Sequence, residues 1–184
     1  MRQSSLRQAL LRQTLRLHPD SRCDAATGIA VDVALPRPGS LVLSYVVSGK
    51  IGALRMPATV AAGRSDELWR HTCFEAFVRP STGSTYYEFN FSPSTRWAAY
   101  CFSGYRSGMR VATEIGAPRI EVRSNAESYS LQAALELDRL SPPWRLGLSA
   151  VLEETNGRKS YWALTHAPGK ADFHHADCFA LELS

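Results

Sequence analysis

Two consecutive segments of the chain, residues 71–78 and 85–91, each have a more apolar set of alternate positions and a set that carries acidic or amide side chains, Glu75 in the first segment and Glu88 and Asn90 in the second. Successive side chains of a β-strand point to opposite faces, so this alternation separates a polar face from an apolar one. If the two segments pair as a hairpin, their polar side chains share one surface. That surface would hold Glu75, Glu88 and Asn90, with Arg96 within reach at the start of the next strand.

Carboxylates, an amide and a guanidinium group beside a tryptophan are the side chains that bind sugars and polyols. Carboxylate and guanidinium groups make bidentate hydrogen bonds with neighbouring hydroxyls. An indole ring covers the apolar face of a sugar, and Trp69 could provide that ring. The alternative is structural, because the outer face of an antiparallel sheet is commonly polar and carries Glu–Arg pairs. The spacing alone leaves both interpretations open.

Ionisable side chains also gather in one late loop, residues 166–175. Loops of this kind often carry function, and two adjacent histidines with a nearby aspartate could hold a metal ion. The simpler interpretation is a loop pinned to the sheet by hydrogen bonds. We expect the loop to form the rim of a ligand pocket, without a metal ion. Its ionisable residues are His166, Lys170, Asp172, His174 and His175.

The sequence lacks the motifs on which common enzyme mechanisms depend. It has no Gly-rich phosphate loop, no GxSxG nucleophile elbow and no HExxH metal motif. Cys73 and His71 lie two residues apart on a predicted strand, but no third group is identifiable that would orient them for nucleophilic catalysis. Glu75 and Glu88 match a glycosidase acid and base in residue type only. We therefore predict that the protein is not an enzyme.

The elements that position these residues are predicted to be short strands separated by turn signals. Asn156 and Gly157 form a strong hairpin signal. The pattern predicts an all-β fold, an antiparallel, jelly-roll-like β-sandwich of about ten strands. Helices are expected at Leu6–Leu15 and Leu137–Leu140 at most. The expected strands are residues 29–35, 41–47, 71–78, 85–91, 97–102, 120–123, 129–137, 146–152, 161–165 and 179–183.

The chain of 184 residues fits one domain, which we place at residues 15–184. Residues 1–14 are predicted to be a basic tail, either disordered or a short helix. The net charge of +4 comes from the first eighteen residues, which contain no acid. Because the remaining 17 basic and 17 acidic residues balance, we expect no nucleic-acid partner. The four arginines of the N-terminal region are Arg2, Arg7, Arg12 and Arg16.

No apolar stretch is long enough for a membrane span or for the core of a signal peptide. The four cysteines are Cys23, Cys73, Cys101 and Cys178. Their spacing matches neither a disulfide framework nor a common zinc site. These observations predict a cytoplasmic protein with reduced thiols and no membrane partner.

Two blocks of the sequence resemble the signature of DOMON-like domains. Residues 68–77 contain a Leu-Trp pair with a Glu six residues after the Trp. Residues 86–93, Tyr-Tyr-Glu-Phe-Asn-Phe-Ser-Pro, correspond to the strand that follows. Residues 104–109, 161–166 and 172–175 resemble the bacterial DOMON-like subgroup more narrowly. The resemblance covers most of the chain and implies a β-sandwich of about ten strands with a non-catalytic binding role.

The superfamily of DOMON domains and family 9 carbohydrate-binding modules also implies ligand contacts. Trp69 matches a Trp that stacks on sugar in carbohydrate-binding members, and Glu75 and Arg96 have the spacing of polar sugar contacts. Trp162 is the candidate for a second stacking aromatic. Cys73 stands where the family often has Asp, which removes a charged ligand for a sugar or a cation.

Haem is the second ligand class that the superfamily implies, held by Met and His axial ligands. The spacing of the candidates selects no pair, so haem is a weaker alternative and the main expectation is no cofactor. The candidates are Met56, Met109, His71, His166 and His174.

We therefore predict a module that binds a small polar ligand, such as a sugar or a sugar derivative. A scaffolding domain that binds a protein partner or a second copy of the chain is the alternative. A concave pocket around Trp69 would favour the small ligand, whereas a flat exposed patch would favour the protein. The predicted site comprises Trp69, Glu75, Glu88, Asn90, Arg96, Trp162, His166 and His174.

Overall fold

A computed structural model describes residues 10–140 and 142–184, which form β-strands joined by loops and single turns of 3₁₀ helix. The all-β class predicted from the sequence is confirmed. No helix in the described residues is long and apolar enough to cross a membrane. The 3₁₀ turns are η1 (Ile51–Ala53), η2 (Leu68–Arg70) and η3 (Ala176–Cys178). The strands are β1 (Leu11–Leu17), β2 (Ala26–Ala34), β3 (Ser40–Gly49), β4 (Gly63–Arg64), β5 (Cys73–Pro80), β6 (Tyr86–Phe91), β7 (Arg96–Phe102), β8 (Arg110–Val111), β9 (Arg119–Ser124), β10 (Ser128–Glu136), β11 (Trp144–Glu153), β12 (Lys159–Ala163) and β13 (Leu181–Leu183).

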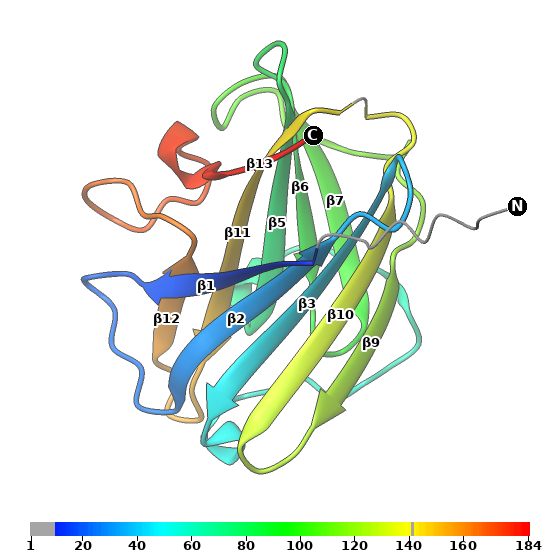
Figure 1. Ribbon diagram of the computed structural model, residues 1–184. Helices are drawn as coiled ribbons and strands as arrows, with labels where there is room; N and C mark the ends of the chain where they lie inside the picture. Colours follow the sequence, from blue (N-terminus) through cyan, green and yellow to red (C-terminus); the bar gives the residue numbers. More distant parts are fainter. Residues whose placement is uncertain (1–9, 141) are drawn as a thin grey trace, which may run out of the picture.

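The strands form one continuous sheet that curls into an open half-barrel (Figure 1). Its path runs β4-β7-β6-β5-β11-β12-β1-β2-β3-β10-β9, with β13 paired to β11 and β8 paired to β7. Strand β1 joins the two arms of the sheet, because Leu11–Leu15 pairs with β2 whereas Arg16 and Leu17 pair with β12. The finer prediction of an antiparallel sandwich is not confirmed, since the sheet is continuous and β4 pairs with β7 in parallel.

Strand β1 corrects the described part of the helix expected at Leu6–Leu15, because residues 11–15 are extended; residues 6–9 lie outside the described residues. Leu11 and Leu15 are four residues apart and share a helical face, but an even spacing also places them on one face of a strand. Backbone pairing with β2 favours the strand, in which Leu15 is buried. Residues 1–9, most of the predicted basic tail, lie outside the described residues. Residues 137–140, the other expected helix, form a turn.

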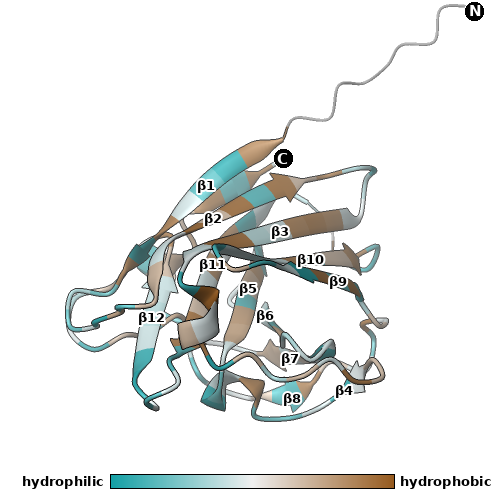
Figure 2. Cartoon of the chain, turned by 90° about the horizontal axis from the view of Figure 1, so that it is seen from below, coloured by the Kyte–Doolittle hydropathy of each residue, from teal (hydrophilic) through white to brown (hydrophobic). Residues whose placement is uncertain are grey.

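Large apolar side chains from both arms meet in the core between them. The Phe74 ring of β5 lies 5.1 Å from the Tyr45 ring of β3 and 6.1 Å from the Tyr129 ring of β10, between centroids. The Tyr45 hydroxyl also donates a hydrogen bond to the Glu75 carbonyl oxygen at 2.8 Å. Hydrophobic and hydrophilic residues alternate along the strands in Figure 2. Each arm thus presents an apolar face to the other arm, and burying these two faces against each other stabilises the curled sheet.

The register of the β5–β6 hairpin confirms the predicted parity. Phe74 faces the core, whereas Phe77 belongs to a separate apolar cluster on the outer face. Glu75 pairs with Asn90 across the hairpin, and Phe77 pairs with Glu88. The two carboxyl side chains and Asn90 therefore lie on one surface of the sheet.

The outer face of β5, β6 and β7 is covered by the loop that follows β12. Phe173 and Phe179 from this loop pack against Phe77, Tyr86 and Phe102 of the sheet. The Phe77 and Phe179 ring centroids, for example, lie 6.1 Å apart. This packing makes the outer face of the sheet, with its aromatic and carboxyl side chains, the floor of a partly enclosed space.

Candidate functional site

A cavity of about 550 Å³ opens between the outer face of the β5–β6–β7 region and the loop that follows β12. Side chains from β5, β6, β7, β11 and β12 line it, together with residues of the loops after β7 and β12. A volume of this size accommodates a small organic molecule. The lining residues are Trp69, Glu75, Phe77, Glu88, Phe102, Arg106, Met109, Val151, Tyr161, Ala171, Phe173 and His174.

Two glutamates contribute buried carboxyl groups to this cavity. Glu75 is 3% exposed and Glu88 is 6% exposed. The Ser149 hydroxyl donates a hydrogen bond to Glu75 Oε2 at 3.2 Å, and Asn90 Nδ2 donates one to Glu88 Oε1 at 2.7 Å. Glu75 is thus oriented by a donor on the neighbouring strand β11, and Glu88 by a donor two residues further along its own strand β6.

Burial sets the protonation of this pair. Loss of hydration raises the pKa of Glu75 well above its usual value, and the negative charge of Glu88 raises it further. Burial also raises the pKa of Glu88, whereas the amide of Asn90 and the charge of Arg106 act in the opposite direction. The pair therefore retains a proton at a pH at which exposed glutamates are ionised, and it can both donate and accept hydrogen bonds.

His174 closes one side of the cavity in its neutral form. Its Nδ1 atom is hydrogen-bonded to the Tyr86 hydroxyl at 2.8 Å, and its Nε2 atom lies 3.6 Å from Glu88 Oε2. Burial lowers the pKa of His174 to about 4, and the charge of Arg106 contributes in the same direction. At neutral pH His174 therefore adds a polar group without a charge.

An ion pair ties the two rim loops together. The Arg106 guanidinium contacts Asp172 Oδ1 through Nη2 at 2.7 Å and through Nε at 3.2 Å. The Tyr105 hydroxyl also donates to the Asp172 carboxylate. These contacts hold residues 103–108 against residues 171–175 at the mouth of the cavity.

Aromatic rings form the walls. Phe77, Phe102, Tyr161 and Phe173 line the interior. Trp69 is 37% exposed and stands edge-on to Tyr100, with 5.8 Å between the ring centroids. The cavity thus combines buried polar groups with flat apolar surfaces, the combination that binding sites for small organic ligands use.

Four of the residues predicted from the sequence line this cavity: Trp69, Glu75, Glu88 and His174. Asn90 does not line it but supports it through the hydrogen bond to Glu88. Their role in binding stays a prediction, whereas their position around one cavity is a feature of the structure.

Three other predicted residues lie elsewhere, which corrects their expected place in the site. Trp162 belongs to the core between the arms, and its indole Nε1 donates to Ser160 Oγ at 3.0 Å. Its neighbour Tyr161 faces the cavity instead, because adjacent strand residues point to opposite sides. His166 Nε2 is hydrogen-bonded to the Arg16 carbonyl oxygen at 2.8 Å. Arg96 pairs with Gly63 at the edge of the sheet.

No protein-family model matches the chain, and no curated protein matches it. Among solved structures, it is similar to a putative carbohydrate-binding protein from Bacteroides uniformis ATCC 8492, with a TM-score of 0.66. The match covers 91% of this chain and 83% of that chain at 16% sequence identity. The two chains share a fold. At this identity the likeness concerns the fold alone, and the DOMON-like resemblance of the sequence stays a prediction.

Cys73 lies beneath the carboxyl pair as a protonated thiol. It is fully buried, and its Sγ donates to Asn90 Oδ1 at 3.5 Å. Burial raises the pKa of this thiol well above its usual value, and the charge of Glu75 adds to the effect. A thiol in this state is a poor nucleophile, so Cys73 contributes packing and weak hydrogen bonds to Asn90 and to the Phe74 carbonyl oxygen.

The residues around the cavity do not fit a haem group. Met109 and His174 both line it, but an axial histidine needs a ring nitrogen directed at an open position. His174 Nδ1 is bonded to Tyr86, and its Nε2 faces Glu88. For metal ions, no group of three His, Cys, Asp or Glu side chains in the described residues could hold one.

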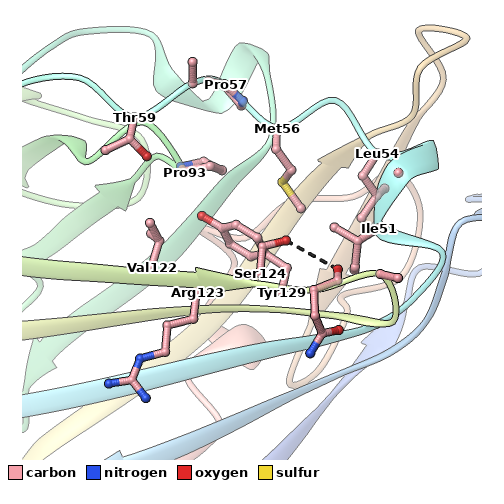
Figure 3. A pocket seen from close by; sticks show the side chains of 14 residues that line it. Ile51, Leu54, Met56, Pro57, Thr59, Pro93, Val122, Arg123, Ser124 and Tyr129 are labelled. Atoms are coloured by element: carbon pink, nitrogen blue, oxygen red, sulfur yellow. Dashed lines mark hydrogen bonds between the residues drawn. The ribbon is translucent and has the colours of Figure 1, made fainter.

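A second cavity, of about 520 Å³, lies between the η1 segment and the β9–β10 hairpin (Figure 3). Its lining is largely apolar and includes Ile51, Met56 and Val122. The Tyr129 hydroxyl is buried there without a hydrogen-bond partner in the described residues. The Arg123 guanidinium points away from the cavity in Figure 3. This cavity is less suited to a polar ligand than the one that contains the glutamates.

Proposed function

We propose that the protein is a non-catalytic module that binds a small polar ligand of the sugar class in the cavity lined by Glu75 and Glu88. The observation that carries the proposal is the combination of two buried carboxyl groups with aromatic walls in one space of about 550 Å³. Carboxyl groups that share a proton can donate to and accept from sugar hydroxyls. The aromatic faces of Trp69 and Tyr161 would cover the C–H faces of a sugar ring.

The fold supports the same conclusion. The structural neighbour from Bacteroides uniformis is a putative carbohydrate-binding protein, and its fold covers most of this chain. The sequence block that resembles DOMON-like domains includes Trp69 and Glu75, and both line the cavity. We propose on these grounds that the chain is a member of that superfamily and binds its ligand without transforming it.

A protein-binding role is the second candidate. A flat exposed patch around Trp69 would favour it, but Trp69 lies at the rim of a concave space. The shape around this residue supports the small ligand.

Tryptophan fluorescence tests the proposal directly. Trp69 is 37% exposed, whereas Trp97, Trp144 and Trp162 are buried at 5% exposure or less. A sugar that stacks in the cavity should therefore change the fluorescence of Trp69 in particular. We expect a panel of mono-, di- and amino sugars to contain compounds that quench this signal and raise the melting temperature.

The Trp69→Phe variant is the matched control for this titration, because it keeps an aromatic ring and removes the reporter indole. We expect the quench to disappear in this variant while the ligand-induced rise in melting temperature remains in part. If no sugar of the panel quenches the fluorescence or raises the melting temperature of the wild type, the proposed ligand class is wrong.

A further inference from the structure

Four glutamates are buried in the described residues, and two of them have an arginine beside them. Glu153 meets the Arg55 guanidinium at 2.9 Å, and Glu154 meets Arg158 at 2.5 Å. Among the described residues, neither Glu75 nor Glu88 has an arginine or lysine within ion-pair distance. All four residues are 6% exposed or less, so the difference lies in the partner and not in the burial.

Each carboxyl of the cavity has one oxygen held by the sheet and one oxygen without a hydrogen bond. Among the described residues Glu75 accepts from Ser149 at Oε2 only, and Glu88 accepts from Asn90 at Oε1 only. The nearest ring nitrogen to Glu88 Oε2 belongs to His174 at 3.6 Å, which is beyond hydrogen-bond distance. One oxygen of each carboxyl group is therefore left to face the cavity.

A buried carboxylate requires a proton or a cation, because loss of hydration is costly for an isolated charge. No arginine or lysine among the described residues forms an ion pair with either glutamate, although the charge of Arg106 at the rim lowers the pKa of both. Arg106 is paired with Asp172 at 2.7 Å, and burial lowers the pKa of His174 to about 4. The other titratable groups close to the pair are neutral when protonated, and none of them can carry a positive charge; they are Tyr45, Cys73, Tyr86 and Tyr100.

The walls favour a cation as well. The π face of an aromatic ring attracts an ammonium group, and the attraction grows where water is excluded. Phe77, Phe102 and Tyr161 line the same space as the two carboxyl groups. Aromatic faces around carboxylates form the environment in which proteins hold organic cations.

We propose that the ligand of this cavity is an organic amine, whose ammonium group lies between Glu75 and Glu88 within the aromatic walls. This inference rests on the proposed function and narrows the ligand from a sugar to an amino sugar or a comparable small amine. When the ammonium group enters, the proton held by the two carboxyl groups leaves to solvent, so that a cation replaces a proton. Binding should therefore release protons and strengthen as the pH rises towards neutrality.

Calorimetric titration with two matched pairs of compounds tests the inference. The first pair is glucosamine and glucose, and the second is 2-phenylethylamine and 2-phenylethanol. In each pair the amine should bind about tenfold more tightly or better at pH 7, since a buried charge pair contributes at least that much. N-acetylglucosamine, which keeps the sugar but loses the charge, should bind like glucose.

Carboxyl-to-amide variants locate the effect. Glu75→Gln and Glu88→Gln keep the shape of the side chain, and each should lower the affinity for the amines about tenfold or more while leaving the neutral compounds within about threefold. Glu121→Gln removes an acid at an exposed position of β9 and should change neither affinity. Thermal unfolding of each variant establishes that it is folded.

The outcomes separate the inference from the proposed function. If each amine binds with the same affinity as its neutral counterpart, the inference of an amine ligand is overturned, whereas the sugar-binding proposal stays in place. Tighter binding of 2-phenylethylamine alone, with no sugar bound, would support the amine and overturn the sugar class. If no amine binds, the inference fails, and if the neutral sugars also fail to bind, the proposed function fails with it.

Discussion

The four buried glutamates show how environment gives one residue type two different tasks. Glu153 Oε1 lies 2.9 Å from the Arg55 guanidinium, and this ion pair joins the end of β11 to the loop that carries Arg55. Glu75 is buried without a paired cation, so its burial contributes little to the stability of the fold. A group that costs stability where an apolar side chain would fit indicates selection for something other than the fold.

Replacing Glu75 should therefore stabilise the free protein. In Glu75→Gln the hydrogen bond from Ser149 is kept and the cost of a buried acid is removed, so we expect the free energy of unfolding at pH 7 to rise by about 1 kcal/mol. Glu153→Gln is the matched comparison and should lower it by about 1 kcal/mol, since Arg55 loses its partner. Urea unfolding of both variants measures the two effects, and a loss of stability in Glu75→Gln would contradict our account.

The same group predicts a dependence on pH. The folded state raises the pKa of Glu75 above its ordinary value of 4.5, so the folded state holds this proton more tightly than the unfolded state. Its contribution to stability is present below pH 4.5 and is lost as the pH rises through the pKa of the folded state. The difference between Glu75→Gln and wild type should thus grow as the pH rises. A difference that is constant with pH would mean that Glu75 titrates normally.

His174 should show the opposite behaviour. Its pKa is lowered from 6.5 to about 4, so the neutral imidazole persists well below neutrality. The stability that depends on this group is present above pH 6.5 and is lost as the pH falls towards 4. Titration of the ring proton resonances by NMR measures the pKa, and a value near 6.5 would show that the ring is not buried against Glu88 and Tyr86.

At the scale of elements, the alternation of β5 and β6 was sufficient to place Glu75, Glu88 and Asn90 on one face. The same rule applied to β12 would have separated Tyr161 from Trp162, because Trp162 and Leu164 form the apolar set that enters the core. The expectation of Trp162 at the site rests on the family resemblance, which takes no account of strand parity.

The rim of the cavity was harder to predict. Arg106 and Asp172 are separated by 66 residues, and the local sequence of neither loop indicates that the two side chains are in contact. Sequence patterns describe one strand or one turn at a time, whereas this ion pair exists only after the sheet has brought the two loops together.

Removing that ion pair should loosen the rim. Asp172→Asn should speed amide hydrogen exchange in residues 103–108 and 171–175, because Asp172 also accepts from Tyr105 and from the His174 backbone. The pair is partly exposed, so we expect the global free energy of unfolding to fall by less than about 1 kcal/mol. Glu136→Gln removes a comparable exposed partner of Arg37 and should leave both loops unchanged. Unchanged amide exchange in Asp172→Asn would show that this ion pair does not hold the two rim loops together.

At the scale of the whole molecule, the all-β class follows from short alternating segments and frequent turns. The curled, continuous sheet does not, because it depends on β1 pairing with β2 and with β12, more than 140 residues away along the chain. Leucines at positions 11 and 15 fit a helix as well as a strand. Only the pairing with β2 and β12 selects the strand over the helix.

Strand β1 should therefore matter to the entire sheet. Leu15 is 2% exposed at the junction of the two arms, and Leu15→Ala should lower the free energy of unfolding by about 2–5 kcal/mol. Leu11→Ala, on the same strand but 37% exposed, should cost less than about 1 kcal/mol. Chemical denaturation compares them, and equal small losses would show that β1 is not integral to the core.

The central claim is that the cavity containing Glu75 and Glu88 is where the ligand binds, and a crystal structure of the protein with glucosamine tests it most directly. Our account predicts the sugar beneath Trp69, with its ammonium nitrogen within hydrogen-bond distance of both carboxyl groups. Glucosamine bound instead in the apolar cavity beside Tyr129, or bound with its nitrogen turned away from Glu75 and Glu88, would contradict it.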